Sequence, residues 1–187
     1  RKVIWVSQSR RKEALDDFFQ LIGKDACQEI KVVACDQHRG YSSSVEEHCP
    51  SATIVWDRFH LVQQFNEALN QDRRDELENI DPEGKMEDLM NNKYKYIFCT
   101  KADHRSKSDR RHIESVMSIN KKMYQIEIMK EHFHKVFDCV TQEEAKEMIN
   151  EIWCWSIEAR AHNIKKWIES IFEAEYFWNY FKYKVTT

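Results

Sequence analysis

The stretch KVVACDQHRGY, residues 31–41, decides the fold of the first part of the chain. An apolar run that passes Cys35 ends on Asp36, and a polar turn follows as far as Gly40 and Tyr41. A nearly continuous apolar run is typical of a strand in a sheet whose two faces are both covered. Asp36 has two interpretations. It either begins a turn by bonding nearby backbone, or it stands at the carboxyl end of a strand, where a carboxylate can hold a metal. Local sequence alone favours the turn.

The segments on either side of this stretch repeat an alternation of strand and helix. KVIWV, residues 2–6, predicts a strand, and SQSRRKEALDDFFQLIG, residues 7–23, predicts a helix that stops at Gly23. Downstream, a short helix closed by Pro50 precedes a third strand, residues 53–57, and a long helix follows. The alternation favours a largely parallel sheet covered by helices, which is an α/β fold.

The pattern changes after the turn IDPEGKM, near Pro82 and Gly84. The sequence from there to the end has helical periodicity and no convincing strand. We therefore expect residues 1–80 to form an α/β core and residues 81–187 to form an all-α region.

Composition narrows the class of protein. Of the 187 residues 42% are hydrophobic and 12% aromatic, which excludes a disordered chain, and only three Gly and two Pro occur, which indicates long helices. There is no run of 18 apolar residues and no apolar signal segment at the start, so we expect a cytoplasmic protein without a membrane partner. The six cysteines form no C-x-x-C pair, which favours reduced thiols over disulfides or zinc. Two weaker zinc-like groups are Cys35 with His38, and His132 and His134 with Cys139.

Positive charge gathers between Lys101 and Lys122. This segment holds seven Lys or Arg against three acids, a balance of +4, whereas the whole chain has a formal net charge of −3. Such a segment can contact DNA phosphates, or it can be a solvated hinge between helices. The candidate DNA-binding residues are Lys101, Arg105, Lys107, Arg110 and Arg111.

The spacing of the two aspartates resembles a known family. Asp36 is followed five positions on by Tyr41, then by Pro50-x-Ala52, and then by the motif Asp57-x-Phe-His60. This arrangement is similar to the catalytic core of DDE transposases of the insertion-sequence L-three family. The resemblance implies a partial ribonuclease H-like three-layer core, with the helical second part as the large all-α insertion of that family.

The resemblance also implies a function, which is metal-dependent cleavage and strand transfer of DNA. Asp36 corresponds to the second of three carboxylates, and it would be a catalytic ligand of Mg²⁺ or Mn²⁺. Asp57 and His60 would support the site, although Asp57 is also a suitable N-cap for the following helix. The partners implied are transposon-end and target DNA and further copies of the transposase in a homo-oligomer.

Two parts of the family pattern are missing. The first Asp and the third Glu are expected outside this chain, so the chain alone is expected to be inactive. Four glutamates in amphipathic helices are not assigned to the third position; they are Glu158, Glu169, Glu173 and Glu175. The alternative is a noncatalytic DNA- or protein-binding domain derived from the same fold.

Overall fold

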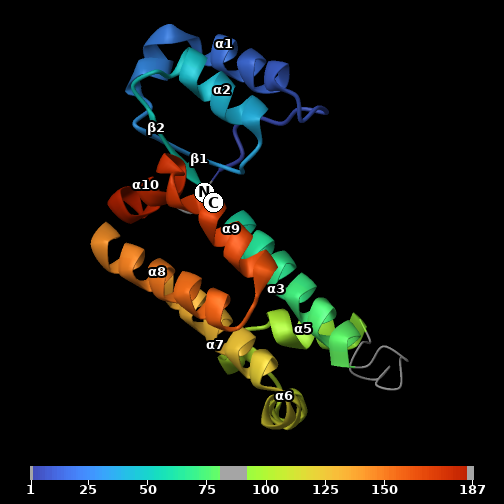
Figure 1. Ribbon diagram of the computed structural model, residues 1–187. Helices are drawn as coiled ribbons and strands as arrows, with labels where there is room; N and C mark the ends of the chain where they lie inside the picture. The colour runs from blue at the N-terminus through green and yellow to red at the C-terminus, as the bar shows by residue number, and fades with distance from the viewer. Residues whose placement is uncertain (1, 81–91, 185–187) are drawn as a thin grey trace. The chain divides into compact units, whose positions relative to one another are not determined.

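The computed structural model describes residues 2–80 and 92–184 and divides into two compact units (Figure 1). The residues up to Leu61, together with the segment that begins at Glu175, form the first unit, and Val62–Ala174 form the second. The long helix α3, Arg58–Ile80, passes from one unit into the other without a break. The boundary between the units therefore lies within a helix, whereas the sequence analysis placed it at residue 80. The turn expected near Pro82 and Gly84 lies outside the described residues.

The first unit contains a parallel pair of strands. β1 is Val32–Cys35 and β2 is Thr53–Trp56, and their register runs from Val32 opposite Thr53 to Cys35 opposite Trp56. Both strands were predicted, and their parallel pairing agrees with the predicted α/β alternation. A crossover helix joins them, as parallel strands require.

The strand predicted at residues 2–6 is wrong. This segment has no regular structure. Its apolar residues are largely exposed: Val3 is 84% exposed, Ile4 75% and Val6 79%. Trp5 anchors the segment to α1, because its Nε1 donates to the carbonyl of Ala14 at 3.2 Å and its ring lies 6.1 Å from that of Phe18. A strand needs a ladder partner for its backbone groups, and the described residues offer none at this position.

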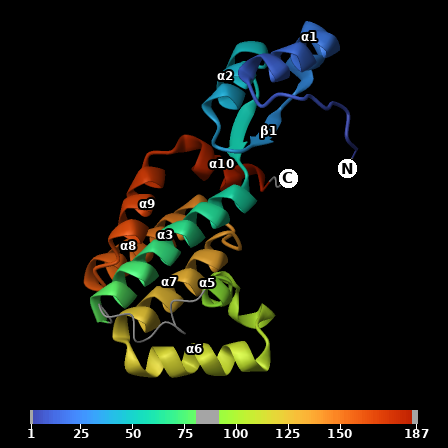
Figure 2. The ribbon, with the colours of Figure 1, turned by 90° about the vertical axis from the view of Figure 1, so that its right-hand side faces the viewer.

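Two helices cover one face of the strands, and a third lies on the other side. Figures 1 and 2 show β1 and β2 between the α1–α2 pair and α10. The first helical segment ends at Gly23, as predicted, because Gly23 takes a non-helical backbone with φ 82° and ψ 163°, and a second segment of α1 follows across this kink. The helices are α1, Lys12–Glu29; α2, Arg39–His48; and α10, Glu175–Tyr183. Buried side chains between α1, α2 and the strands make the core: Phe19, Cys27, Val45, Cys49 and Ile54.

Helix α10 covers the outer edge of β2. The side chain of Asn179 donates from Nδ2 to the carbonyl of Ile54 at 3.0 Å, and the hydroxyls of Thr53 and Tyr183 lie 3.1 Å apart in a hydrogen bond. The last helix of the chain therefore belongs to the α/β unit, although its periodicity alone placed it with the all-α part.

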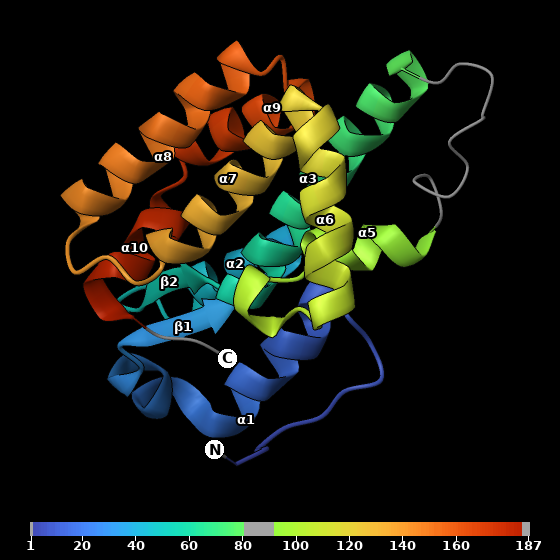
Figure 3. The ribbon, with the colours of Figure 1, turned by 90° about the horizontal axis from the view of Figure 1, so that it is seen from below.

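The second unit is entirely helical in its described residues. Figure 3 shows α7, α8 and α9 side by side, and Figures 1 and 2 show α6 crossing the end of α7. Besides the second part of α3, its elements are α5, Asn92–Cys99; a 3₁₀ turn, Ala102–His104; α6, Lys107–Ile119; α7, Lys121–Val136; α8, Gln142–Glu158; and α9, His162–Phe172. No helix in the described ranges combines the length and apolar character that crossing a membrane requires.

Aromatic stacking and one buried carboxylate join the helices of the second unit. The rings of Phe65 and Phe133 stack at 4.1 Å between centroids, and Trp167 meets both edge-on. Asp72, which is 1% exposed, accepts hydrogen bonds from the backbone N–H groups of Asn163 and Ile164 at 3.0 and 2.8 Å. A carboxylate from α3 therefore caps the N-terminus of α9 and satisfies donors that a helix start leaves unpaired.

Candidate active site

Asp36 lies immediately after β1, at the carboxyl end of the strand. Its side chain is half-buried, and its Oδ1 accepts a hydrogen bond from the backbone N–H of His38 at 3.0 Å. The local bond is the one that the turn interpretation predicts. The strand-end position and the partial exposure are those that the catalytic interpretation requires, so the two interpretations describe the same geometry.

Asp57 occupies the corresponding place after β2. The last pair of the ladder is Cys35 with Trp56, and the backbone N–H of Asp57 donates to the carbonyl of Cys35 at 2.8 Å. Asp36 and Asp57 are therefore the next residues along two adjacent parallel strands. Unlike Asp36, Asp57 is only 3% exposed.

His60, on the first turn of α3, pairs with Asp57, the residue just before the helix. His60 Nδ1 and Asp57 Oδ2 are 2.8 Å apart, and the His60 side chain is 43% exposed whereas that of Asp57 is 4% exposed. The imidazole therefore contacts a buried carboxylate on one side and solvent on the other. Such a bond fixes the orientation of the ring and leaves its other nitrogen to face a substrate.

A cavity of about 540 Å³ opens at these strand ends. Its lining includes Asp36, Asp57 and His60, and Trp5 and Arg10 contribute from the N-terminal segment. The volume is in the range of pockets that bind small organic groups, about 300–1,000 Å³. The two aspartates and the histidine are thus brought together at one open site.

The thiol of Cys35 lies in the same cavity lining. Burial, together with the neighbouring charges of Asp36 and Asp57, raises its pKa to about 11. The thiol is therefore neutral at physiological pH, and it is a poor metal ligand because cysteine binds metals as the thiolate.

We expect Cys35 to react slowly with iodoacetamide in the folded protein. At pH 8 its alkylation should be about 100-fold slower than in urea, because the pKa is about two units above the ordinary value and only the thiolate reacts. Peptide mass spectrometry after timed labelling measures this rate, with the exposed Cys154 as a marker that labels in both states. Equal labelling of Cys35 in both states would contradict the assigned environment.

Comparison with known families gives the identity of the chain. A family model described as "Transposase", that of the DDE transposases of the ISL3 group, matches residues 1–187. The chain belongs to this transposase family. The resemblance predicted from the aspartate spacing is confirmed.

Curated relatives of this transposase chain carry the same description. It is 33% identical over 81 residues to the transposase for insertion sequence element IS1001 of Bordetella parapertussis, which covers 43% of this chain and 20% of the relative. It is 32% identical over 73 residues to the transposase for IS1557 of Mycobacterium tuberculosis, which covers 39% and 16%. The matched parts are thus a fifth or less of the length of these relatives. No solved structure matches the chain significantly.

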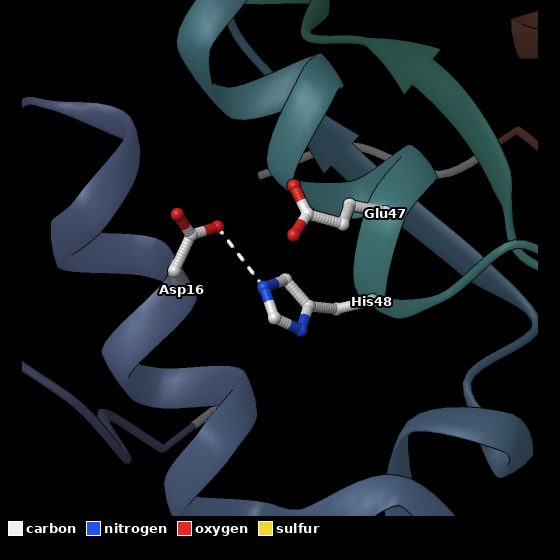
Figure 4. Close-up of side chains that lie close together, drawn as sticks. All are labelled: Asp16, Glu47 and His48. Carbon is white, nitrogen blue, oxygen red and sulfur yellow. Dashed lines mark hydrogen bonds and ion pairs between the residues drawn. The ribbon is translucent and has the colours of Figure 1, made fainter.

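A second group of possible metal ligands occurs elsewhere in this transposase unit. Asp16 on α1 and Glu47 and His48 on α2 bring one ligand atom each to within 4.8 Å of one another (Figure 4). The ammonium of Lys12 already lies between the acids, at 2.8 Å from Asp16 and 2.7 Å from Glu47. Burial acts to raise the pKa of Asp16, but the bonds from Lys12 and Ser44 outweigh it and lower the pKa. The group is therefore an ion-paired contact between α1 and α2. Nothing in the sequence marked it, because Asp16 is 31 residues away from Glu47.

The basic segment of the transposase chain has both an exposed part and a buried part. Lys107, Arg110 and Arg111 are exposed on α6, whose N-cap is Ser106, and Lys101 is half-buried. Arg105 differs, because it is only 8% exposed. The predicted role of Arg105 as a DNA contact is therefore not supported by its surroundings.

Arg105 instead belongs to a buried ion network. Its two terminal nitrogens contact the carboxylate of Glu127 at 2.6 and 2.9 Å, and its Nε donates to the carbonyl of Ile97. Lys130, which is fully buried, donates to the same carboxylate at 3.0 Å and to the carbonyl of Thr100 at 2.8 Å. The network ties the segment between α5 and α6 to α7.

Proposed function

We propose that the chain is the central part of the catalytic core of a DDE transposase that cleaves DNA strands and transfers them in the presence of divalent metal ions. The observation that carries this proposal is the half-exposed Asp36 at the carboxyl end of β1, beside the Asp57–His60 pair and a 540 Å³ cavity. Carboxyl ends of parallel strands are where α/β proteins place their ligands. Cleavage of transposon-end DNA by the full-length protein that contains this chain, with and without Asp36, tests the proposal.

The ribonuclease H-like fold is part of the same proposal, and the free edge of β1 supports it. The backbone N–H groups of Thr53 and Asp57 donate to the carbonyls of Lys31 and Cys35. The N–H and C=O groups of the odd-numbered residues of β1 therefore point toward β2. The backbone groups of Val32 and Ala34 then point away from β2. Because Asn179 covers the outer edge of β2, the sheet can gain strands beyond β1 only. A strand that carries the first catalytic Asp would pair there.

The donors at the strand ends fit Mg²⁺ or Mn²⁺. Both acids offer hard carboxylate oxygens, and the neutral thiol of Cys35 does not compete for such ions. Asp36 would hold the metal, because its carboxylate is the more exposed of the two. When bound, paired divalent ions activate water or a 3′ hydroxyl and stabilise the leaving oxygen. Within the chain, the N–H of His38 holds the Asp36 carboxylate in place, and the buried Asp57 fixes His60 at the cavity.

DNA is the proposed partner, with homo-oligomers of the complete transposase as the proposed assembly. The exposed cations of α6 support DNA contact because all three lie within the first five residues of the helix, where one phosphate backbone could reach them together. Such contacts read phosphates rather than sequence.

The triple variant Lys107→Ala, Arg110→Ala, Arg111→Ala should weaken DNA binding at every sequence tested. The slope of log affinity against log salt should become shallower by about 2 to 3, because each lost phosphate contact contributes about 0.9. Fluorescence anisotropy at several salt concentrations measures both quantities. The matched control removes three exposed lysines from α7, α8 and α9, namely Lys135, Lys146 and Lys166. Equal losses in the two triples would show that α6 is a solvated surface with no special role.

A further inference from the structure

Phe59 is an exposed aromatic residue just after the carboxyl end of β2. It is the second residue of α3, and its side chain is 69% exposed although it is apolar. Its ring stands edge-on to that of His60, at 5.5 Å between centroids and 89° between planes. His60 lines the same cavity as Asp36, and Phe59 contacts His60 from outside that lining, so its ring lies next to the proposed catalytic site.

Arginines neighbour Phe59 and Asp36 along the chain. Arg58 precedes Phe59 on α3, and Arg39 begins α2 directly after the turn that holds Asp36. Aromatic rings beside cationic groups are how proteins bind nucleotides that are not paired, with bases on the rings and phosphates on the cations. A ring needs a free base face to stack on, and a duplex offers one only at its end or at an unpaired nucleotide.

We propose, on the basis of the transposase function above, that Phe59 stacks on an unpaired or duplex-terminal base next to the phosphodiester that is cut. The base rests on the ring, and the adjoining phosphate is directed toward Asp36. Phe59 is thus a substrate-positioning residue, and the edge contact with His60 ties the orientation of its ring to the Asp57–His60 pair.

The experiment uses the full-length protein and transposon-end DNA that carries the fluorescent base 2-aminopurine at successive positions around the cut. Wild type and Phe59→Trp should quench the fluorescence at one position on binding, whereas Phe59→Ala and Phe59→Leu should not. Loss of stacking should weaken binding or raise the KM for cleavage by about 5- to 150-fold for the Ala and Leu variants. The Leu variant separates stacking from apolar packing, because leucine is apolar but has no ring.

The controls separate this inference from the proposed function. Tyr96→Ala removes an equally exposed aromatic ring, 70% exposed, from α5 in the other unit, and it should leave quenching unchanged. Thermal unfolding of every variant checks the fold, which an exposed position should not disturb. If wild type cleaves DNA in an Asp36-dependent way but Phe59→Leu quenches and cleaves like wild type, the stacking role is wrong and the function stands. If no variant cleaves, quenching that depends on an aromatic residue at 59 still supports stacking, and its absence overturns it.

Discussion

Asp36→Ala in the full-length protein should reduce strand cleavage of transposon-end DNA to the background rate. The change removes the half-exposed carboxylate at the end of β1, which is the metal ligand proposed from this chain. In-line displacement needs metal ions that clamp both the attacking and the leaving oxygen, and the remaining ligands cannot fix them. Gel analysis of end-labelled DNA with Mg²⁺ or Mn²⁺ measures the rate.

The fold should survive this substitution. The Asp36 side chain accepts a hydrogen bond from the N–H of His38, and loss of a partly exposed bond costs about 1 kcal/mol. Asp138→Ala, at an exposed position beyond α7, is the matched control and should cleave normally. Cleavage by Asp36→Ala at the wild-type rate would leave Asp36 as a turn residue only. A full-length protein that binds DNA but never cuts it would favour the noncatalytic alternative.

Glu127→Ala should destabilise the helical unit by about 3–5 kcal/mol, the range measured when one partner of a buried ion pair is removed. The substitution leaves the buried guanidinium of Arg105 and the ammonium of Lys130 without their shared carboxylate. Urea unfolding of the 187-residue chain, followed by helical circular dichroism and by tryptophan fluorescence, measures the free energy of unfolding. Two probes are needed because two compact units can unfold separately.

Glu151→Ala is the control for this prediction. Its carboxylate bonds His132 at 2.7 Å, but it is 54% exposed, so its removal should change stability by less than about 1 kcal/mol. A similarly small effect of Glu127→Ala would mean that the network contributes little. Arg105→Ala should behave like Glu127→Ala in unfolding, and it should leave the salt slope of DNA binding unchanged, unlike a residue that contacts phosphate.

The sequence predicted those features that depend on local pattern. The apolar runs of β1 and β2 and the start of α3 are as expected, and the spacing from Asp36 to His60 predicted the family. The geometry of the two strand ends could be expected because parallel neighbours end at the same edge.

Features that depend on distant partners were missed. Residues 2–6 have the composition of a strand, but a strand forms only with a ladder partner, and composition does not supply one. Helix α10 has ordinary helical periodicity, and only its bond from Asn179 to Ile54 places it on the sheet. Arg105 was predicted to contact DNA like the other cations of its segment. No local signal shows that it pairs inside the protein with Glu127, 22 positions later.

The bond between Asn179 and Ile54 also sets a delay during synthesis. The two residues are 125 positions apart, so at bacterial and eukaryotic translation rates of about 5–20 residues per second, Ile54 leaves the ribosome about 6–25 s before Asn179 does. For that time the nascent α/β unit exposes both edges of a two-stranded sheet, and such edges are templates for wrong pairing. A ribosome that stalls within the helical unit would release a chain whose β2 edge is never covered. Among the products of interrupted synthesis, those ending before Glu175 should therefore be the ones that aggregate.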